Sequence, residues 1–352
     1  MQSSNKPSPP LPAMFERYRF DVAETLQKSI SDLHIKEIPN VLQYHLGWVD
    51  RYGNVSQTAS SQGKALRPTL CMFSCDALGG DIARAVLGAA ALELIHNFSL
   101  IHDDIQDQDV ERRHQSTVWS IWGIPKALVA GDAMQAVGDI TALMGMEKGV
   151  PVNVVLRVSE ILTESYLEMI EGQCLDLRFE TRTDISSDDY LGMVARKTGA
   201  LLRSSVHIGA LIATDDEHIT QAFSEFGDHI GRAFQIRDDY LGIWGDAAET
   251  GKSNDNDIRR RKKSFPVVYG FENASGTAKN ELISIYNQEI DDEGDVAKVM
   301  AILEDVGAPQ YSGEITEKSA ELALSAISGV DLPHWANQEI EDLVNFLVNR
   351  QY

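Results

Sequence analysis

The sequence has few cysteines and few basic residues for its length. Three cysteines among 352 residues cannot form a disulfide framework and suit a reducing cytosol, so we expect a cytoplasmic protein. Lysine and arginine number 31 against 53 aspartates and glutamates, which gives a formal net charge of −22. A field this acidic repels phosphate backbones, so we expect no nucleic-acid partner. Any phosphorylated ligand would need local basic residues or bridging metal ions.

Long hydrophobic runs are also scarce. Glu93 interrupts the apolar run that begins at Ala85, and no stretch approaches the roughly 18 apolar residues of a membrane span. We therefore expect no transmembrane segment. Residues 1–13 hold four prolines beside Ser, Asn and Lys, and they lack the apolar core of a signal peptide. We expect this segment to be a flexible, proline-rich leader.

What the sequence does have is helical periodicity. Apolar residues recur at a spacing of four from Met14 onward, as in Val22, Leu26 and Ile30, while alternating and β-branched runs are short. No linker interrupts residues 14–352, so we predict one all-α domain, a single large helical bundle around a central apolar cavity. The expected helices span about 15–33, 39–51, 66–78, 82–105, 127–146, 152–179, 188–213, 217–243, 262–271, 277–288, 295–306, 311–327 and 332–350.

Three carboxylates end one of these apolar helices. Asp103, Asp104 and Asp107 follow the apolar residues 89–101, and a helix would place Asp103 and Asp107 on one face, one turn apart. These carboxylates repel each other at the helix end that disfavours anions, by about 0.3–1 kcal/mol each. A hard divalent cation such as Mg²⁺ would compensate them. An ordinary solvated helix end is the alternative.

A second acidic pair, Asp238 and Asp239, ends another apolar helix much later in the chain, after residues 223–236. Two such helices in one bundle can face each other across a cavity with carboxylates at its mouth and apolar walls below. That arrangement suits a ligand with a diphosphate head and a hydrophobic tail, with metal ions bridging the head to the protein.

Basic residues adjoin both acidic clusters or interrupt apolar runs. Arginine binds phosphate in a bidentate manner and lysine binds it as a point charge, although an ordinary surface ion pair is the alternative for any single cation. The candidates are Lys64, Arg67, Arg112, Arg113, Lys197, Lys252 and residues 259–263.

Together these segments resemble the trans-isoprenyl diphosphate synthases, the polyprenyl synthetase family, and most closely its short-chain geranylgeranyl diphosphate synthases. Residues 103–107 (Asp-Asp-Ile-Gln-Asp) are similar to the family's DDxxD motif, and residues 63–68 are similar to its GKxLRP segment. A lone DDxxD motif is weak evidence for this family, but the full set of matching segments, in the family's order and spacing, is specific to it. The other matching segments are Gly172-Gln173 through Asp176, Lys197-Thr198, residues 234–239, Gly251-Lys252 and Asp257-Ile258.

The resemblance implies a Mg²⁺-dependent, homodimeric prenyltransferase that condenses isopentenyl diphosphate with dimethylallyl, geranyl or farnesyl diphosphate. It implies that Mg²⁺ binds to Asp103, Asp107 and Asp239, with Asp104 and Asp238 in support. It further implies contacts to the allylic diphosphate from Arg112, Lys197 and Lys262, and to isopentenyl diphosphate from Lys64, Arg67, His96 and Arg113. Thr198 and Gln235 would face the carbocation, and Lys252 would close the site from a loop.

Three features bear on how this chain differs within the family. Gly242 stands where the second motif often has its third acid. His114 and Ser116 replace the usual Gly and Pro after Arg113, so we expect a different loop shape. Phe98, five residues before Asp103, would form the floor of the chain-length pocket, and the small Ser99 would leave space beside it. This combination favours geranylgeranyl diphosphate as product, although plain core packing is the alternative for Phe98.

Other functions compete with this interpretation. A farnesyl diphosphate synthase of the same family is the nearest. A class I terpene cyclase shares the bundle but does not need a second diphosphate site at Lys64, Arg67 and His96. A non-catalytic partner subunit usually loses aspartates of the first motif. A di-iron carboxylate bundle needs paired Glu-x-x-His motifs, and Glu93 with His96 fits only once.

Overall fold

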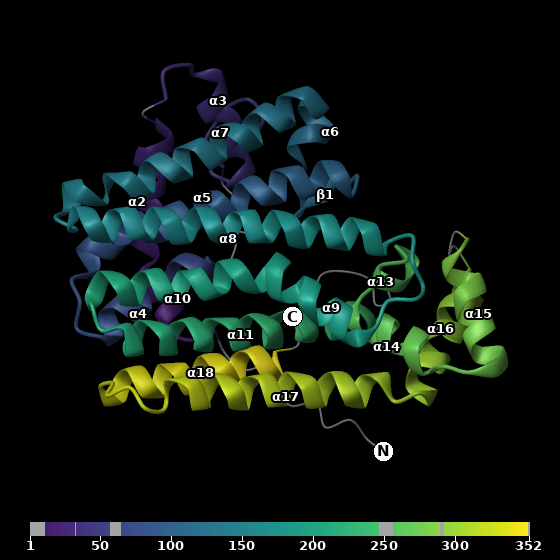
Figure 1. The fold of residues 1–352 in the computed structure, drawn as a ribbon. Helices are drawn as coiled ribbons and strands as arrows, with labels where there is room; N and C mark the ends of the chain where they lie inside the picture. The colour runs from purple at the N-terminus through teal and green to yellow at the C-terminus, as the bar shows by residue number, and fades with distance from the viewer. Residues whose placement is uncertain (1–10, 32, 57–64, 246–255, 289–291, 351–352) are drawn as a thin grey trace. The chain divides into compact units, whose positions relative to one another are not determined.

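The computed structural model describes residues 11–31, 33–56, 65–245, 256–288 and 292–350 (Figure 1). Within these ranges the secondary structure is helical except for a two-stranded antiparallel hairpin and one isolated bridge between Val49 and Val55. The all-α prediction is confirmed. The chain divides into two compact units: unit 1 contains residues 1–12, 167–203 and 224–352, and unit 2 contains residues 13–166 and 204–223. The single-domain assignment of residues 14–352 stays a prediction.

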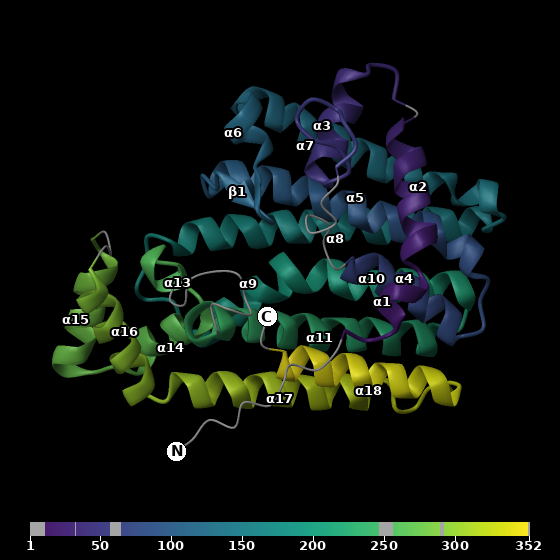
Figure 2. The ribbon, with the colours of Figure 1, turned by 180° about the vertical axis from the view of Figure 1, so that it is seen from behind.

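Unit 2 is built around the long helix α5, Ile82–Gln106, against which α2, α4 and α7 pack (Figures 1 and 2). The Asp81 side chain caps α5 by accepting a hydrogen bond from the Ala83 amide at 3.0 Å. Gly131 of α7 permits close packing, because a Cβ there would lie 2.2 Å from His102 Nε2. The other elements of the unit are α1 Met14–Arg17, α2 Arg19–Ser31, α3 Glu37–His45, α4 Leu66–Ala77, β1 Glu111–Arg112, β2 Gln115–Ser116, α6 Val118–Trp122, α7 Ile124–Leu143 and the 3₁₀ turn η2 Met144–Lys148.

Helix α5 is also the one described helix that is long and apolar enough to cross a membrane by length and composition. The most apolar window of 18 residues is 78% buried inside the protein. A helix at the centre of a folded core passes the same test, so this feature is weak evidence for a membrane span.

Unit 1 contains two hydrophobic clusters. One cluster surrounds Phe265 and Tyr190, and the other surrounds Leu303 and Phe271. Helices α17 and α18 lie side by side in both views (Figures 1 and 2). The elements are α9 Ser187–Val194, the π-helical turn η3 Ala195–Gly199, α13 Asn256–Arg259, α14 Phe265–Asn273, α15 Gly276–Tyr286, α16 Glu293–Asp305, α17 Ala308–Ile327 and α18 His334–Asn349. Helices α8 Val152–Phe179, α10 Ala200–Ala213 and α11 Glu217–Trp244 contribute residues to both units.

Most helix positions follow the periodicity, and the differences have local causes. The helix expected over residues 39–51 ends at His45, because Gly47 adopts a φ of 75° and Asp50 accepts amide hydrogen bonds from Tyr52 and Asn54 in a turn. The helix expected from residue 127 begins at Ile124, next to Pro125 in its first turn. The short helices α6 and α13 and the hairpin lack a long periodic signal and were not predicted.

Candidate functional site

The first acidic cluster lies where the sequence places it, at the end of α5 in unit 2. Asp103 is half-buried, Asp107 is exposed and Asp104 is only 1% exposed. Arg112 of β1 donates from Nε to Asp104 Oδ1 at 2.6 Å. Burial raises the pKa of Asp104, and the Arg112 charge opposes that rise. The structure thus assigns Arg112 a direct ion pair with an acid of the first motif.

The loop after this cluster is a tight hairpin. Its two central residues, Arg113 and His114, both adopt positive φ values, 52° and 60°, as a two-residue turn with primed geometry requires. Tyr44 holds the hairpin to α3, because its hydroxyl donates to the Ser116 carbonyl at 2.7 Å and its own carbonyl accepts from Gln115 Nε2 at 3.1 Å. The hairpin fixes the direction in which both arginines leave the backbone.

Two half-buried arginines and a histidine lie beside the first cluster. Burial lowers the pKa of His96 well below its usual range, and the nearby charges of Arg67 and Arg113 lower it further, so His96 is neutral at pH 7. Burial also lowers the pKa of Arg67 to about 10, although the Glu93 carboxylate acts in the opposite direction. The structure therefore brings Arg67, His96 and Arg113 together, as the resemblance implies for one diphosphate site.

Two buried nitrogens in this region have no hydrogen-bond partner among the described residues: Arg67 Nε and His45 Nε2. His45 also lines a small pocket of about 20 Å³ with Asp104, Arg112 and Arg113. Burial, with the charges of these two arginines, lowers the pKa of His45 to about 3. Buried polar atoms rarely stay unpaired in folded proteins, so these nitrogens suit an anionic ligand or bound water.

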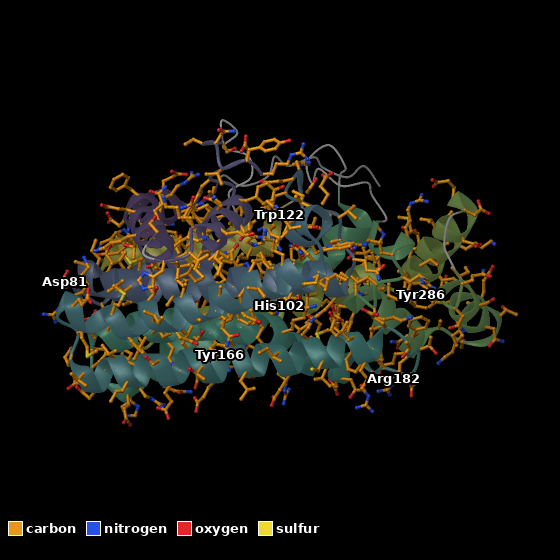
Figure 3. All side chains as sticks on the ribbon, turned by 90° about the horizontal axis from the view of Figure 1, so that it is seen from above. Asp81, His102, Trp122, Tyr166, Arg182 and Tyr286 are labelled. Atoms are coloured by element: carbon orange, nitrogen blue, oxygen red, sulfur yellow. The ribbon has the colours of Figure 1, made fainter. Side chains whose placement is uncertain are left out.

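The proposed pocket floor also lies in unit 2. Phe98 is 3% exposed, and its ring meets the rings of His102 and Tyr166 edge-on, with centroid distances of 5.8 and 6.2 Å. His102 lies on α5 and Tyr166 on α8 (Figure 3). Burial raises the pKa of Asp139 on α7, and the Tyr166 side chain opposes that rise. The hydroxyl of Ser99 donates to the His96 carbonyl at 2.8 Å.

The second acidic cluster, in unit 1, centres on Asp239, which is fully buried. Its Oδ2 accepts hydrogen bonds from the Tyr190 hydroxyl and from the Phe265 amide, the latter at 3.1 Å. Its Oδ1 accepts from Gln235 Nε2 at 3.0 Å and lies 3.5 Å from Lys262 Nζ. Burial raises the pKa of Asp239, and Lys262 and Tyr190 counteract the rise.

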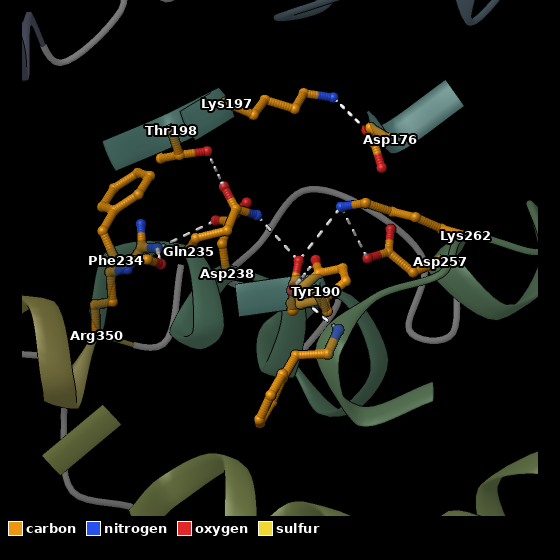
Figure 4. Close-up of polar contacts among 12 residues, drawn as sticks. Asp176, Tyr190, Lys197, Thr198, Phe234, Gln235, Asp238, Asp257, Lys262 and Arg350 are labelled. Atoms are coloured by element: carbon orange, nitrogen blue, oxygen red, sulfur yellow. Dashed lines mark hydrogen bonds and ion pairs between the residues drawn. The ribbon is translucent and has the colours of Figure 1, made fainter. Parts of the chain in front are cut away.

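Lys197 and Thr198 lie in the π-helical turn η3, a distortion that is frequent at functional sites (Figure 4). Lys197 forms an ion pair with Asp176, and Thr198 Oγ1 donates to Gln235 Oε1 at 2.7 Å. Thr198, Gln235 and Asp239 therefore form one hydrogen-bonded chain. The turn packs on Gly172, where a Cβ would lie 2.3 Å from the Lys197 amide nitrogen.

Asp238 has a partner that the sequence did not reveal. Arg350, near the end of the chain, is 4% exposed and donates from Nη2 to Asp238 Oδ1 at 3.2 Å and to the Phe234 carbonyl at 3.0 Å. Its own carbonyl accepts two hydrogen bonds from Arg237. Tyr190 was missed in the same way. Asp176 and Asp257 lie within matched motifs, but the sequence assigned them no role.

The oxygen donors of the two clusters fit a hard divalent cation. No three His, Cys, Asp or Glu side chains converge tightly enough in the described ranges to hold a metal ion unaided. Mg²⁺ usually takes one or two carboxylates and fills its remaining positions with substrate phosphate and water. The exposed Asp107 and the partner-free, buried Oδ2 of Asp104 are oxygens suited to such an ion.

Two parts of the predicted site stay predictions. Lys64 and Lys252 lie outside the described residues. Asp103 and Asp107 belong to unit 2 and Asp239 to unit 1, and each unit is described by itself. The shared metal site that joins these three aspartates is therefore taken up below as a proposal.

Comparison with known proteins agrees with the motifs. A family model described as polyprenyl synthetase matches residues 51–303. The (2E,6E)-farnesyl diphosphate synthase of Mycobacterium tuberculosis is 36% identical over 314 residues, 88% of this chain and 86% of the relative. The geranylgeranyl diphosphate synthase of the same organism is 36% identical over 318 residues, 90% of this chain and 88% of the relative.

The solved structures give the same result. A polyprenyl synthetase from Streptomyces coelicolor superposes with a TM-score of 0.88 at 34% identity, covering 96% of this chain and 99% of that one. A geranylgeranyl pyrophosphate synthetase from Pyrococcus horikoshii superposes with a TM-score of 0.83 at 34% identity, and the match covers 96% of this chain and 98% of that one. The order of the motifs, the helical fold and these matches agree, and the chain belongs to the polyprenyl synthetase family.

Proposed function

We propose that this chain condenses isopentenyl diphosphate with an allylic diphosphate and that its main product is geranylgeranyl diphosphate. Its family and its two mycobacterial relatives, one named a farnesyl and the other a geranylgeranyl diphosphate synthase, support a short-chain trans-prenyltransferase. The observation that carries the proposal is the cluster of the two cations Arg67 and Arg113 with neutral His96, beside the aspartates of α5. A terpene cyclase has no need of that second diphosphate site.

Two separate sets of residues would bind the two diphosphate substrates. Arg67 and Arg113, with neutral His96 as a hydrogen-bonding group, would bind isopentenyl diphosphate, together with Lys64. Arg112, Lys197 and Lys262 would bind the allylic diphosphate. Mg²⁺, held by Asp103, Asp107 and Asp239, would stabilise the negative charge on the leaving diphosphate.

The hydrogen-bonded chain of Thr198, Gln235 and Asp239 would orient oxygen dipoles toward the allylic cation. The apolar walls would exclude water that would otherwise quench it. Lys252 would close the site. The proposed product length rests on Phe98, whose ring would limit the depth of the pocket, while the small Ser99 would leave room beside it. Farnesyl diphosphate is the alternative product.

The quaternary state and the location of the protein are part of the proposal. Several large apolar side chains are exposed on α7 and on the first half of α8, which supports a homodimer: Ile124, Leu128, Ile140, Val152 and Leu156. The low cysteine count supports a cytoplasmic location. Detection of the tagged chain in a membrane or secreted fraction would contradict it.

The test is an elongation assay on the purified full chain. We expect elongated diphosphates by mass analysis when isopentenyl diphosphate, an allylic primer and Mg²⁺ are present, and none after EDTA is added. Arg67→Gln should raise the KM for isopentenyl diphosphate at least tenfold and leave the KM for the primer nearly unchanged. Arg84→Gln, at a half-exposed arginine that pairs with Asp81, is the control. Hydrocarbon products would instead indicate a cyclase.

A further inference from the structure

The glycine at position 242 has a neighbour that explains it. Gly242 lies on α11, three residues after Asp239. A Cβ at this position would lie 2.2 Å from Oδ2 of Asp257, 2.6 Å from its Cγ and 3.2 Å from its Oδ1. No side chain can therefore occupy position 242 unless the Asp257 carboxylate moves. The space that a side chain at position 242 would enter is already filled by a carboxylate.

That carboxylate comes from a different segment of the chain. Asp257 lies on the short helix α13, and its side chain is 17% exposed. Its backbone carbonyl accepts a hydrogen bond from the Lys262 amide at 2.8 Å. This bond closes a turn, and the Lys262 side chain points back toward the Asp257 carboxylate (Figure 4).

Lys262 links Asp257 to the second motif. Its Nζ lies 3.5 Å from Asp257 Oδ2 and 3.5 Å from Asp239 Oδ1. The Lys262 ammonium is therefore held between two carboxylates, one on α11 and one on α13.

We propose that Asp257 supplies, from α13, the third carboxylate that the second aspartate-rich motif lacks at position 242. Asp257 is a positioning residue in this proposal: it holds the Lys262 ammonium beside Asp239, where Lys262 meets the allylic diphosphate. The inference rests on the proposed function for the identity of that ligand. The contact between Gly242 and Asp257 stands independently of it.

The sharpest test exchanges the two residues. Gly242→Asp with Asp257→Ala moves the carboxylate back onto α11 and clears the space for it. Gly242→Ala with Asp257→Ala makes the same space but provides no carboxylate, so it is the matched control. Asp257→Asn keeps the shape of the side chain and removes only its charge. Gly242→Asp alone combines the steric clash with repulsion between two acids.

Three measurements are made on each variant: melting temperature without metal, calorimetric binding of inorganic pyrophosphate with Mg²⁺, and the KM for the allylic substrate. We expect Asp257→Asn and the alanine pair to weaken pyrophosphate binding and raise this KM about tenfold. In the exchanged pair, both the affinity for pyrophosphate and the KM for the allylic substrate should return to within about threefold of the wild-type values. Gly242→Asp alone should have the lowest melting temperature, and Asp257→Ala should relieve that loss.

Several results would overturn the proposal. The exchanged pair could bind pyrophosphate no better than the alanine pair, which would make the contact purely steric. Asp257→Asn could also bind like the wild type, and that variant settles the matter if the exchanged pair does not fold. Failure of the proposed function is a separate result: the wild type would then make no elongated product, while the melting temperatures would still show the coupling between positions 242 and 257.

Discussion

At the scale of single residues, the proposed floor of the chain-length pocket can be tested at the contact between Phe98 and Tyr166. Phe98→Ala should lengthen the main product by at least one isoprene unit, because the substitution removes the ring that we propose limits the depth of the pocket. Tyr166→Ala should have the same effect to a smaller degree, because Phe98 loses the ring that packs edge-on against it. Mass analysis of the products checks both variants.

Phe20→Ala is the control for these variants, since Phe20 is 76% exposed and belongs to no buried cluster. An unchanged product distribution for Phe98→Ala would leave plain core packing as the role of Phe98.

Lys263 gives a pH prediction at the same scale. The residue is 5% exposed, and its Nζ lies 4.5 Å from the ring centroid of Tyr286 and 4.8 Å from that of Phe271. Burial, with the nearby charge of Arg261, lowers the pKa of Lys263 to about 8 from 10.5. Between these values the unfolded chain binds more protons than the native one, so this group makes the free energy of unfolding rise with pH.

We expect urea titrations at pH 8 and pH 10 to show this rise in the wild type relative to Lys263→Met. The variant should be the more stable of the two at pH 7, because it no longer buries a charge. The prediction would be contradicted if the free energies of unfolding of the wild type and Lys263→Met differed by the same amount at pH 8 and at pH 10.

At the scale of elements, the π-helical turn η3 depends on a glycine in another helix. Gly172→Ala should lower the free energy of unfolding by about 1–3 kcal/mol, because the added Cβ would collide with the Lys197 backbone. It should also reduce kcat, since Lys197 and Thr198 shift with the turn. Denaturant titration and steady-state kinetics measure the two effects.

Gly192→Ala in α9 is a matched control, because nothing lies within 4 Å of its added Cβ. This substitution should be neutral or should stabilise the protein by up to about 1 kcal/mol through its helix propensity. A Gly172→Ala protein as stable as this control would show that the turn can adjust.

At the scale of the whole molecule, the exposed apolar side chains of α7 and α8 predict an assembly. Leu128→Glu with Leu156→Glu should convert a homodimer to monomers, because each change would bury a charge in the interface. Sedimentation velocity measures the mass directly. Leu322→Glu on α17, at a leucine that is 40% exposed, is the control and should stay dimeric. A monomeric wild type would remove the homodimer from the proposal.

The sequence predicted the helical fold well because long helices carry a local signal. Helix α8 has the predicted bounds, and α4, α5 and α11 differ from theirs by one residue, since each buries one stripe of apolar residues at a regular period. The hairpin around Arg113 and the short helix α13 were missed, because pieces this short have no period to detect. Their conformations depend on contacts to Tyr44 and Lys262 instead.

The candidate site was likewise predicted only in part from the sequence. The sequence by itself determined the family and the motif residues such as Asp104, Arg67 and Asp239, because their identity and spacing are written along the chain. Only the tertiary structure decided that Arg350 pairs with Asp238, that Tyr190 binds Asp239 and that Asp257 fills the space over Gly242. Each of these partners lies between 15 and 112 residues away along the chain. Such contacts form only when folding brings distant segments together, and no local pattern records them.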